Sequence, residues 1–164
     1  MKTQAADVII VGGGFMGAAS AFFLRKRGLS VILLERGLIG QQASGVNFGN
    51  VRRQGRAIEQ LPLANRSREI WLKLKELIGE DVELLLSGHL RIGYRPEHAE
   101  RLEKYAHDAQ PYGLGLQMMS AKAVHERFPY LGPEVTAGCY APYDGHANPR
   151  LAAPAFGRAA VREG

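Results

Sequence analysis

The chain has 164 residues, of which 46% are hydrophobic and 23% are charged. These ordinary globular proportions exclude a disordered chain, a coiled coil and a disulfide scaffold, and the length suits one compact domain or the beginning of a larger protein. Twenty-one Lys and Arg residues against 16 Asp and Glu residues give a net charge of +5. Because no nucleic-acid motif accompanies this excess, we expect no nucleic-acid partner, whereas an anionic small molecule would be favoured.

Targeting and metal-binding signals are missing from the sequence. It has no apolar segment long enough to cross a bilayer and no signal peptide, so we expect a cytoplasmic protein without a membrane span. Its one cysteine, Cys139, lies in an apolar segment and is expected to be a small buried side chain. The histidines and the cysteine do not have the spacing of a zinc site, so no metal is expected.

The first 35 residues indicate a strand, a helix and a second strand. Residues 7–11 and 31–34 are short, β-branched apolar runs typical of buried parallel strands. Between them a run of three glycines precedes a predicted helix over residues 15–27, which ends in basic residues followed by Gly28. The sequence therefore predicts an α/β fold that begins with a right-handed Rossmann-like crossover unit.

The glycines between the first strand and the helix match the pattern G-x-G-x-x-G at Gly12, Gly14 and Gly17. In this pattern the glycines permit the tight turn, the close approach of a pyrophosphate and close helix packing. An acid, Glu35, follows at the end of the second strand, where its carboxylate can accept the hydroxyl groups of an adenosine ribose. Because Glu35 would repel a 2′-phosphate, NADP is disfavoured, and FAD and NAD both stay open on this evidence.

Further elements follow a polar, glycine-rich loop over residues 37–55, which is long enough to suggest a functional role. One continuous helix is predicted over residues 62–78, with Leu63 and Leu74 on its buried face, and residues 84–86 and 89–94 suggest a bent strand or a hairpin. The remaining predicted elements are a helix over 96–109, a strand over 116–119, a short helix after Ser120, a strand over 135–143 and a helix over 149–162.

Five segments resemble the flavin-dependent amine and amino-acid oxidoreductases, which include D-amino-acid oxidase, glycine oxidase and sarcosine oxidase. The resemblance is strongest to the sarcosine oxidase β-subunit-like dehydrogenases. It rests on DVIIVGGGFMGAASAFFLRKRGLSVILLER, QQASGVNFGNVR, PLANRSREIW, SGHLRIG and DGHANPRLAAPAFGRAA, which occur in this order along the chain. The resemblance implies FAD as cofactor. It also implies an oxidation of the C–N bond of a small amine or amino acid, by hydride transfer to the flavin.

The resemblance also assigns cofactor-binding residues. It implies pyrophosphate contacts from the glycine turn, a ribose contact from Glu35 and an adenine contact from Arg36, while the loop lines the flavin and Arg52 approaches its ring. The alternative is that Arg52 and its neighbour Arg53 are exposed loop charges. No catalytic residue is assigned, and the expected cofactor-binding residues are Gly12, Gly14, Phe15, Met16, Gly17, Glu35, Arg36, Ala43, Ser44, Asn47, Gly49, Asn50 and Arg52.

The resemblance covers only the N-terminal part of the family's members, which are more than twice as long. It divides the chain into a first segment of an FAD-binding domain (1–83), the beginning of an α+β substrate domain (84–140) and a return to the FAD-binding domain (141–164). We therefore expect a missing C-terminal half or a complementary partner chain, and self-association of the isolated chain. Two alternatives stay open: a catalytically silent dinucleotide-binding fragment, and an NAD-dependent dehydrogenase.

Overall fold

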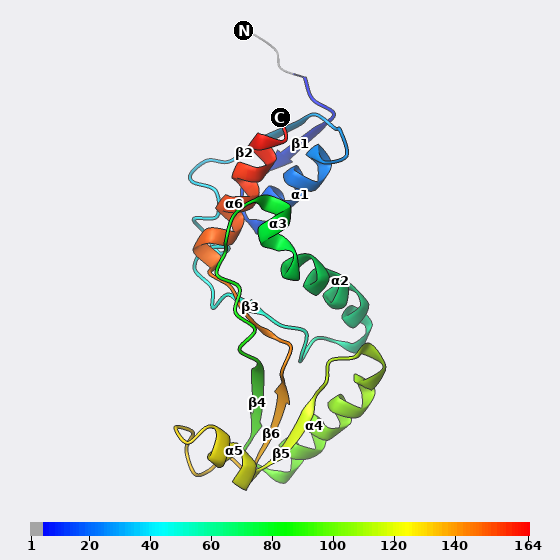
Figure 1. Ribbon diagram of the computed structural model, residues 1–164, viewed down its shortest axis with the longest axis vertical. Helices are drawn as coiled ribbons and strands as arrows, with labels where there is room; N and C mark the ends of the chain where they lie inside the picture. Colours follow the sequence, from blue (N-terminus) through cyan, green and yellow to red (C-terminus); the bar gives the residue numbers. More distant parts are fainter. Residues whose placement is uncertain (1–4) are drawn as a thin grey trace. The chain divides into compact units, whose positions relative to one another are not determined.

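The computed structural model describes residues 5–164, which form two compact units (Figure 1). The first unit runs to Asn50 and also contains Leu72–Leu84 and Ala147–Gly164. The second contains Val51–Trp71 and Leu85–His146. The domain boundaries at residues 83 and 140, which the resemblance implies, stay a prediction. In the described part of the chain, no helix is both long enough and apolar enough to cross a membrane.

The first unit begins with the predicted parallel crossover. Strand β1 (Val8–Val11) leads into helix α1 (Phe15–Arg25), which leads into strand β2 (Val31–Leu34). The two strands are parallel, with Val8 opposite Val31 and Val11 opposite Leu34. The strand, helix and parallel arrangement expected from the apolar runs is therefore confirmed.

A core of small and aromatic side chains packs α1 against the last helix, α6 (Pro149–Arg162). Phe156 of α6 contacts Phe15 and Phe22 of α1 edge to face, at ring-centroid distances of 5.4 and 5.7 Å. The alanines of both helices let the backbones approach closely, and burial of this apolar surface stabilises the pair. The buried alanines are Ala18, Ala21, Ala152, Ala153, Ala155, Ala159 and Ala160.

One face of the two-stranded sheet is open. Ile9, Val11 and Leu34 have relative exposures of 60%, 84% and 54%. Since side chains alternate between the two faces of a strand, these exposed apolar residues mark one uncovered face.

The second unit is built on an antiparallel sheet in the order β4-β6-β5. Strand β6 (Ala137–Ala141) is central, and all five of its residues are buried. It pairs with β4 (His89–Gly93) and β5 (Gln117–Ser120), which are accompanied by helices α4 (Pro96–Asp108) and α5 (Ala121–Arg127) (Figure 1). Ser120 caps α5 as predicted, accepting a hydrogen bond from the amide of Ala123.

The expected bent strand or hairpin over residues 84–94 is wrong. β4 pairs with β6, more than 40 positions further along the chain, and Leu85 makes an isolated bridge with His146. The physical reason is that β6 offers hydrogen-bonding groups on both sides and pairs with β4 on one of them. Residues 84–86 are too few to form a competing strand. The strand expected over 135–143 is correspondingly trimmed to Ala137–Ala141.

The helix expected over residues 62–78 is divided in two. Helix α2 (Leu61–Leu72) and helix α3 (Leu74–Ile78) are separated at Lys73, whose backbone leaves the helical region with φ −107° and ψ 9°. The break resets the helical periodicity, so Leu63 is 74% exposed although Leu74 is buried. One buried cluster of the second unit contains Leu61, Ala109 and Leu114.

Four further short elements lie in residues 5–164. Two are strands, β3 (Asn50–Val51) and β7 (Gly145–His146), and two are 3-10 helices, η1 (Ile58–Gln60) and η2 (Gln110–Tyr112). Helix α6 begins at a side-chain cap, because Asn148 Oδ1 accepts the amide of Arg150 at 3.0 Å. Near the other end of α6, Arg158 and Arg162 both donate to the carboxylate of Glu80, which follows α3.

Candidate functional site

The glycine turn between β1 and α1 has the geometry that the G-x-G-x-x-G pattern requires. Gly12 has φ +103°, a left-handed conformation that favours glycine, and its amide donates to Leu34 O at 2.8 Å. A Cβ atom on Gly17 would stand 1.9 Å from the carbonyl oxygen of Gly12. Gly17 therefore lets α1 start directly against the end of β1, and the first amides of the helix gather beside the turn.

These amides and their surroundings suit an anionic ligand. The first amides of a helix have no partner within it, and the helix dipole attracts negative charge to them. The first turn of α1 contains no acidic residue that would compete with such a ligand. The cradle formed by Gly12, Gly14 and Gly17 therefore fits the pyrophosphate of a dinucleotide.

Glu35 lies beside the turn, at the end of β2. Its Oε2 atom accepts the Gly13 amide at 2.6 Å and its Oε1 atom accepts the Gly37 amide at 2.9 Å. The hydrogen bond from Gly13, followed by that from Gly37, lowers the pKa of this half-buried carboxyl. Each carboxylate oxygen can accept a further hydrogen bond, so Glu35 is an ionised acceptor for hydroxyl groups.

The loop after Glu35 returns to the start of α1. Ser44 Oγ accepts the amide of Phe15 at 2.8 Å, so this part of the loop lies beside the glycine turn. Asn47 holds the loop in shape, since its side chain donates to Ala43 O and Ser44 O and accepts the Gly49 amide at 2.7 Å. The first unit thus brings Glu35, Ser44 and the glycine turn together.

The other predicted cofactor-binding residues have fewer contacts. Met16, Arg36 and Asn50 are exposed residues of the first unit, with Met16 78% exposed. Arg52 belongs to the second unit, where its guanidinium donates to Gln54 O. The assignment of all thirteen residues to a cofactor stays a prediction.

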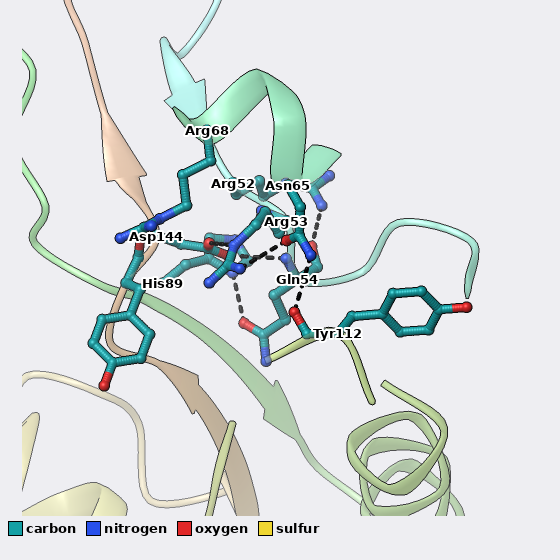
Figure 2. A network of polar contacts seen from close by, with 9 residues as sticks. Arg52, Arg53, Gln54, Asn65, Arg68, His89, Tyr112 and Asp144 are labelled. Carbon is teal, nitrogen blue, oxygen red and sulfur yellow. Dashed lines mark hydrogen bonds and ion pairs between the residues drawn. The ribbon is translucent and has the colours of Figure 1, made fainter. Parts of the chain in front are cut away.

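A buried polar network that the sequence did not reveal lies in the second unit (Figure 2). Its centre is Asp144, which is 1% exposed. Asp144 Oδ2 accepts the backbone amides of Arg53 and Gln54 at 3.0 and 2.8 Å, and Oδ1 lies 3.4 Å from Arg53 Nε. Arg53 is itself only 6% exposed, so its interpretation as an exposed loop charge is wrong.

The network extends outward from Arg53 and Gln54. Arg53 Nη1 donates to Asn65 Oδ1 at 2.8 Å, and Asn65 Nδ2 donates to Tyr112 O at 3.0 Å. Gln54 Nε2 donates to Cys139 O at 2.9 Å. Burial of Cys139 is confirmed, and it raises the pKa of the thiol, so this cysteine is a packed, protonated side chain.

His89, on β4, completes the network. Because the Gln54 amide donates to a carbonyl through Nε2, its Oε1 must be the acceptor for His89 Nδ1, 2.8 Å away. Burial, followed by the positive charges of Arg52 and Arg91, lowers the pKa of His89 and keeps the ring neutral. His146, in the Asp144-Gly145-His146 turn, lies at the surface with Nδ1 3.1 Å from Ser87 Oγ. Within that turn, the residue that makes the buried polar contacts is therefore Asp144.

The first unit thus combines a parallel crossover, a glycine turn at the start of α1 and an acid, Glu35, at the end of the neighbouring strand. Residues 7–164 match the family model described as "FAD dependent oxidoreductase" (DAO). The chain belongs to this family, whose cofactor is FAD.

Known relatives extend the comparison. Glycine oxidase from Geobacillus kaustophilus is 32% identical over 170 residues, covering 99% of this chain and 45% of that protein. A crystal structure of glycine oxidase from the same organism superimposes with a TM-score of 0.91 at 30% identity, covering 99% of this chain and 46% of that one. One of the subunits of opine oxidase from Rhizobium meliloti is 29% identical over 153 residues, covering 87% of this chain and 41% of that protein. The chain therefore spans less than half the length of these relatives.

Proposed function

We propose that the whole protein oxidises the C–N bond of a small amine or amino acid, using FAD as the hydride acceptor. The observation that carries this proposal is the glycine turn at the start of α1, with Glu35 beside it, in a chain of the FAD-dependent oxidoreductase family. The names of the relatives support the substrate class, because one acts on glycine and another on opines. The resemblance to sarcosine oxidase and the cytoplasmic location stay predictions.

In this proposal different residues bind different parts of the cofactor. The amides of the turn bind the pyrophosphate, and Glu35 accepts the ribose hydroxyls, with Arg36 near the adenine. The loop residues Ala43, Ser44, Asn47, Gly49 and Asn50 line the flavin arm, and Arg52 approaches the ring. Bound FAD would supply the electron-pair acceptor for the oxidation. A guanidinium beside the ring would stabilise negative charge there, which gives Arg52 a physical role.

Cofactor titration tests the first part of the proposal. We expect the whole protein to bind FAD at least tenfold more tightly than NAD, with FAD binding followed by flavin fluorescence and NAD binding by its displacement of FAD. Glu35→Gln removes the negative charge that faces the ribose and should weaken FAD binding. Glu76→Gln, which neutralises an exposed acid of the same unit, is the matched control. Tighter binding of NAD, or equal affinities for the two variants, would contradict the assignment.

We further propose that the activity needs protein outside these 164 residues, supplied by the same or a complementary chain. The short span relative to the relatives supports this, and the name of the opine oxidase relative indicates that it works as one of several chains. Hydride transfer needs the substrate carbon held about 3–3.5 Å from its acceptor, which requires walls on both sides of the ring. The 164-residue chain with FAD, a dye acceptor and sarcosine, proline or D-amino acids should show no steady dye reduction. Turnover that follows the chain through purification would refute this.

A further inference from the structure

Gln54 is a fully buried, uncharged side chain in the middle of the arginine loop, residues 52–56 (Figure 2). Its Nε2 atom donates to Cys139 O at 2.9 Å, and its Oε1 atom lies 2.8 Å from His89 Nδ1. Its backbone amide donates to Asp144 Oδ2 at 2.8 Å. The three partners belong to β6, to β4 and to the turn between β6 and β7. Three separate segments of the second unit therefore fix both the side chain and the backbone of Gln54.

The carbonyl group of Gln54 in turn holds Arg52. Arg52 Nη1 donates to Gln54 O, so the guanidinium folds back onto the loop two residues further along the chain. Gly55 leaves room for this contact, because a Cβ atom on it would stand 3.2 Å from Arg52 Nη1. Among the described residues, no ion pair involves Arg52. The position of its guanidinium therefore depends on a carbonyl that the buried network immobilises.

The contacts of the Gln54 side chain explain why this position needs an amide. The carbonyl oxygen of Cys139 can only accept a hydrogen bond, so the group that faces it must donate. The group that faces His89 Nδ1 must accept, and one amide supplies both. An apolar side chain would lose both contacts, and a carboxylate would lose the donor. A network in which every member is satisfied holds its residues in one arrangement.

We propose that Gln54 is a positioning residue, which holds the guanidinium of Arg52 in place for the flavin ring. The inference rests on the proposed function, in which Arg52 approaches that ring. Because Gln54 is enclosed by protein, it acts through Arg52 and not by contact with the cofactor. A charged group that acts on a reacting centre is effective when a supporting shell of hydrogen bonds fixes its position.

Arginine modification tests the positioning without the cofactor. The whole protein, freed of flavin, is treated with phenylglyoxal, and modification of Arg52 is followed by mass spectrometry. Gln54→Leu keeps most of the volume and removes both side-chain hydrogen bonds, so it should release the guanidinium and speed its modification several-fold. Val124→Ala alters a fully buried apolar residue of the same unit and is the matched control for lost stability. It should leave the rate at Arg52 unchanged.

The reduction potential of bound FAD gives a second readout. A cation beside the ring stabilises the negative charge that reduction adds, so release of Arg52 should lower the potential. Gln54→Leu exchanges one neutral side chain for another, so its effect on the potential comes through the position of Arg52. It should shift the potential in the same direction as Arg52→Gln and add nothing to it in the double variant. A merely structural role would leave the potential unchanged or give additive shifts.

His89→Leu supplies an independent variant in case Gln54→Leu does not fold. His89 is half-buried on an edge strand, and its replacement removes one of the two side-chain contacts of Gln54. Burial lowers the pKa of His89, so at about pH 8 this substitution also changes no charge. It should speed the modification of Arg52 and lower the potential, by less than Gln54→Leu does.

Two results would overturn the positioning role. One is a rate of Arg52 modification that stays at the wild-type value, or matches that of Val124→Ala, in the Gln54 and His89 variants. The other is an additive shift of the potential in the double variant. FAD titration of the same samples keeps the two proposals apart. Faster modification of Arg52 in a protein that binds no FAD would refute the proposed function alone, and FAD binding with unchanged modification would refute the positioning role alone.

Discussion

A methyl group at Gly17 has no room. Its carbon would lie 1.9 Å from the Gly12 carbonyl oxygen, which is a backbone atom and cannot rotate away. Gly17→Ala should therefore push α1 away from β1 and destabilise the first unit by roughly 1–3 kcal/mol or more. It should also weaken FAD binding, because the amides of the turn would move. Urea unfolding followed by circular dichroism measures the first effect.

Gly28→Ala is the matched control for this prediction. Gly28 has a positive φ of +80°, but nothing lies within 4 Å of the position of an added Cβ atom. The substitution should cost about 1 kcal/mol through backbone conformation alone. It should leave FAD affinity unchanged. If the two variants had equal effects, close packing of α1 on β1 would not be the reason for a glycine at position 17.

Asp144→Asn tests the buried network at the same scale. An asparagine side chain has one acceptor oxygen where three donors now converge, and Arg53 would remain buried without a counter-charge. Breaking a buried ion pair by removing one partner costs about 3–5 kcal/mol, so we expect a loss of about 3 kcal/mol in urea unfolding. Asp108→Asn, at an exposed pair with Lys104, should change stability little. Equal effects of the two substitutions would contradict the role of Asp144.

At the scale of elements, Glu80 links the segment after α3 to helix α6. Its pKa is lowered chiefly by the hydrogen bond from Arg158, and next by that from Arg162, against the opposing effect of burial. A carboxylate with a lowered folded pKa stabilises the protein above its unfolded pKa, and this contribution is lost as the pH falls through the folded value. The contribution should therefore be complete at pH 7 and decline below the ordinary value of 4.5.

Glu80→Gln removes this dependence. Because the pair is partly exposed to solvent, we expect a loss of about 0.5–1 kcal/mol at pH 7 that shrinks toward zero in acid. Thermal unfolding between pH 3 and pH 7 measures the difference. Glu76→Gln, at an exposed position on α3, should follow the wild-type curve. A constant difference between wild type and Glu80→Gln across this range would contradict the assignment.

Elements specified by neighbouring residues were predictable from the sequence. The glycine turn, the apolar runs around it and the proline at the start of α4 act locally, so β1, α1, β2 and α4 follow the prediction. The pairing of β4 with β6 depends on residues more than 40 positions apart, which no local pattern encodes. The break at Lys73 was missed for a related reason, since the apolar spacing continues across it while the backbone does not.

The buried pair of Arg53 and Asp144 was not predictable in the same way. Arg53 stands between Arg52 and Gln54 in a polar loop, a context typical of exposed charges. The available signal was Asp144 itself, an acid directly after a buried apolar strand, because a carboxylate in that place requires donors. By contrast, the contacts among the glycine turn, Glu35 and Ser44 agree with the sequence prediction of a dinucleotide cradle.

At the scale of the whole molecule, the uncovered face of the β1–β2 sheet should govern association. Ile9, Val11 and Leu34 place exposed apolar side chains on a sheet of two strands, both of which are edges. Such surfaces promote association between copies. Val11→Lys should therefore reduce dimers and larger species several-fold in sedimentation velocity. Val161→Lys, at a 78% exposed position on α6, should not. If both substitutions reduced association equally, the added positive charge would be the cause, and not the loss of an apolar side chain from the open face of the sheet.

The hydrogen bonds from Arg53 and Gln54 to Asp144 also determine when the second unit can finish folding. They join residues 91 and 90 positions apart. During synthesis from the N-terminus, Arg53 therefore has no counter-charge until Asp144 has emerged from the ribosome. Closing a loop of this length late is slow compared with forming a helix or a crossover unit. Within the second unit, the arginine loop should be among the last segments to reach its native shape, and a nascent chain stopped before residue 144 would hold a charged loop that it cannot bury.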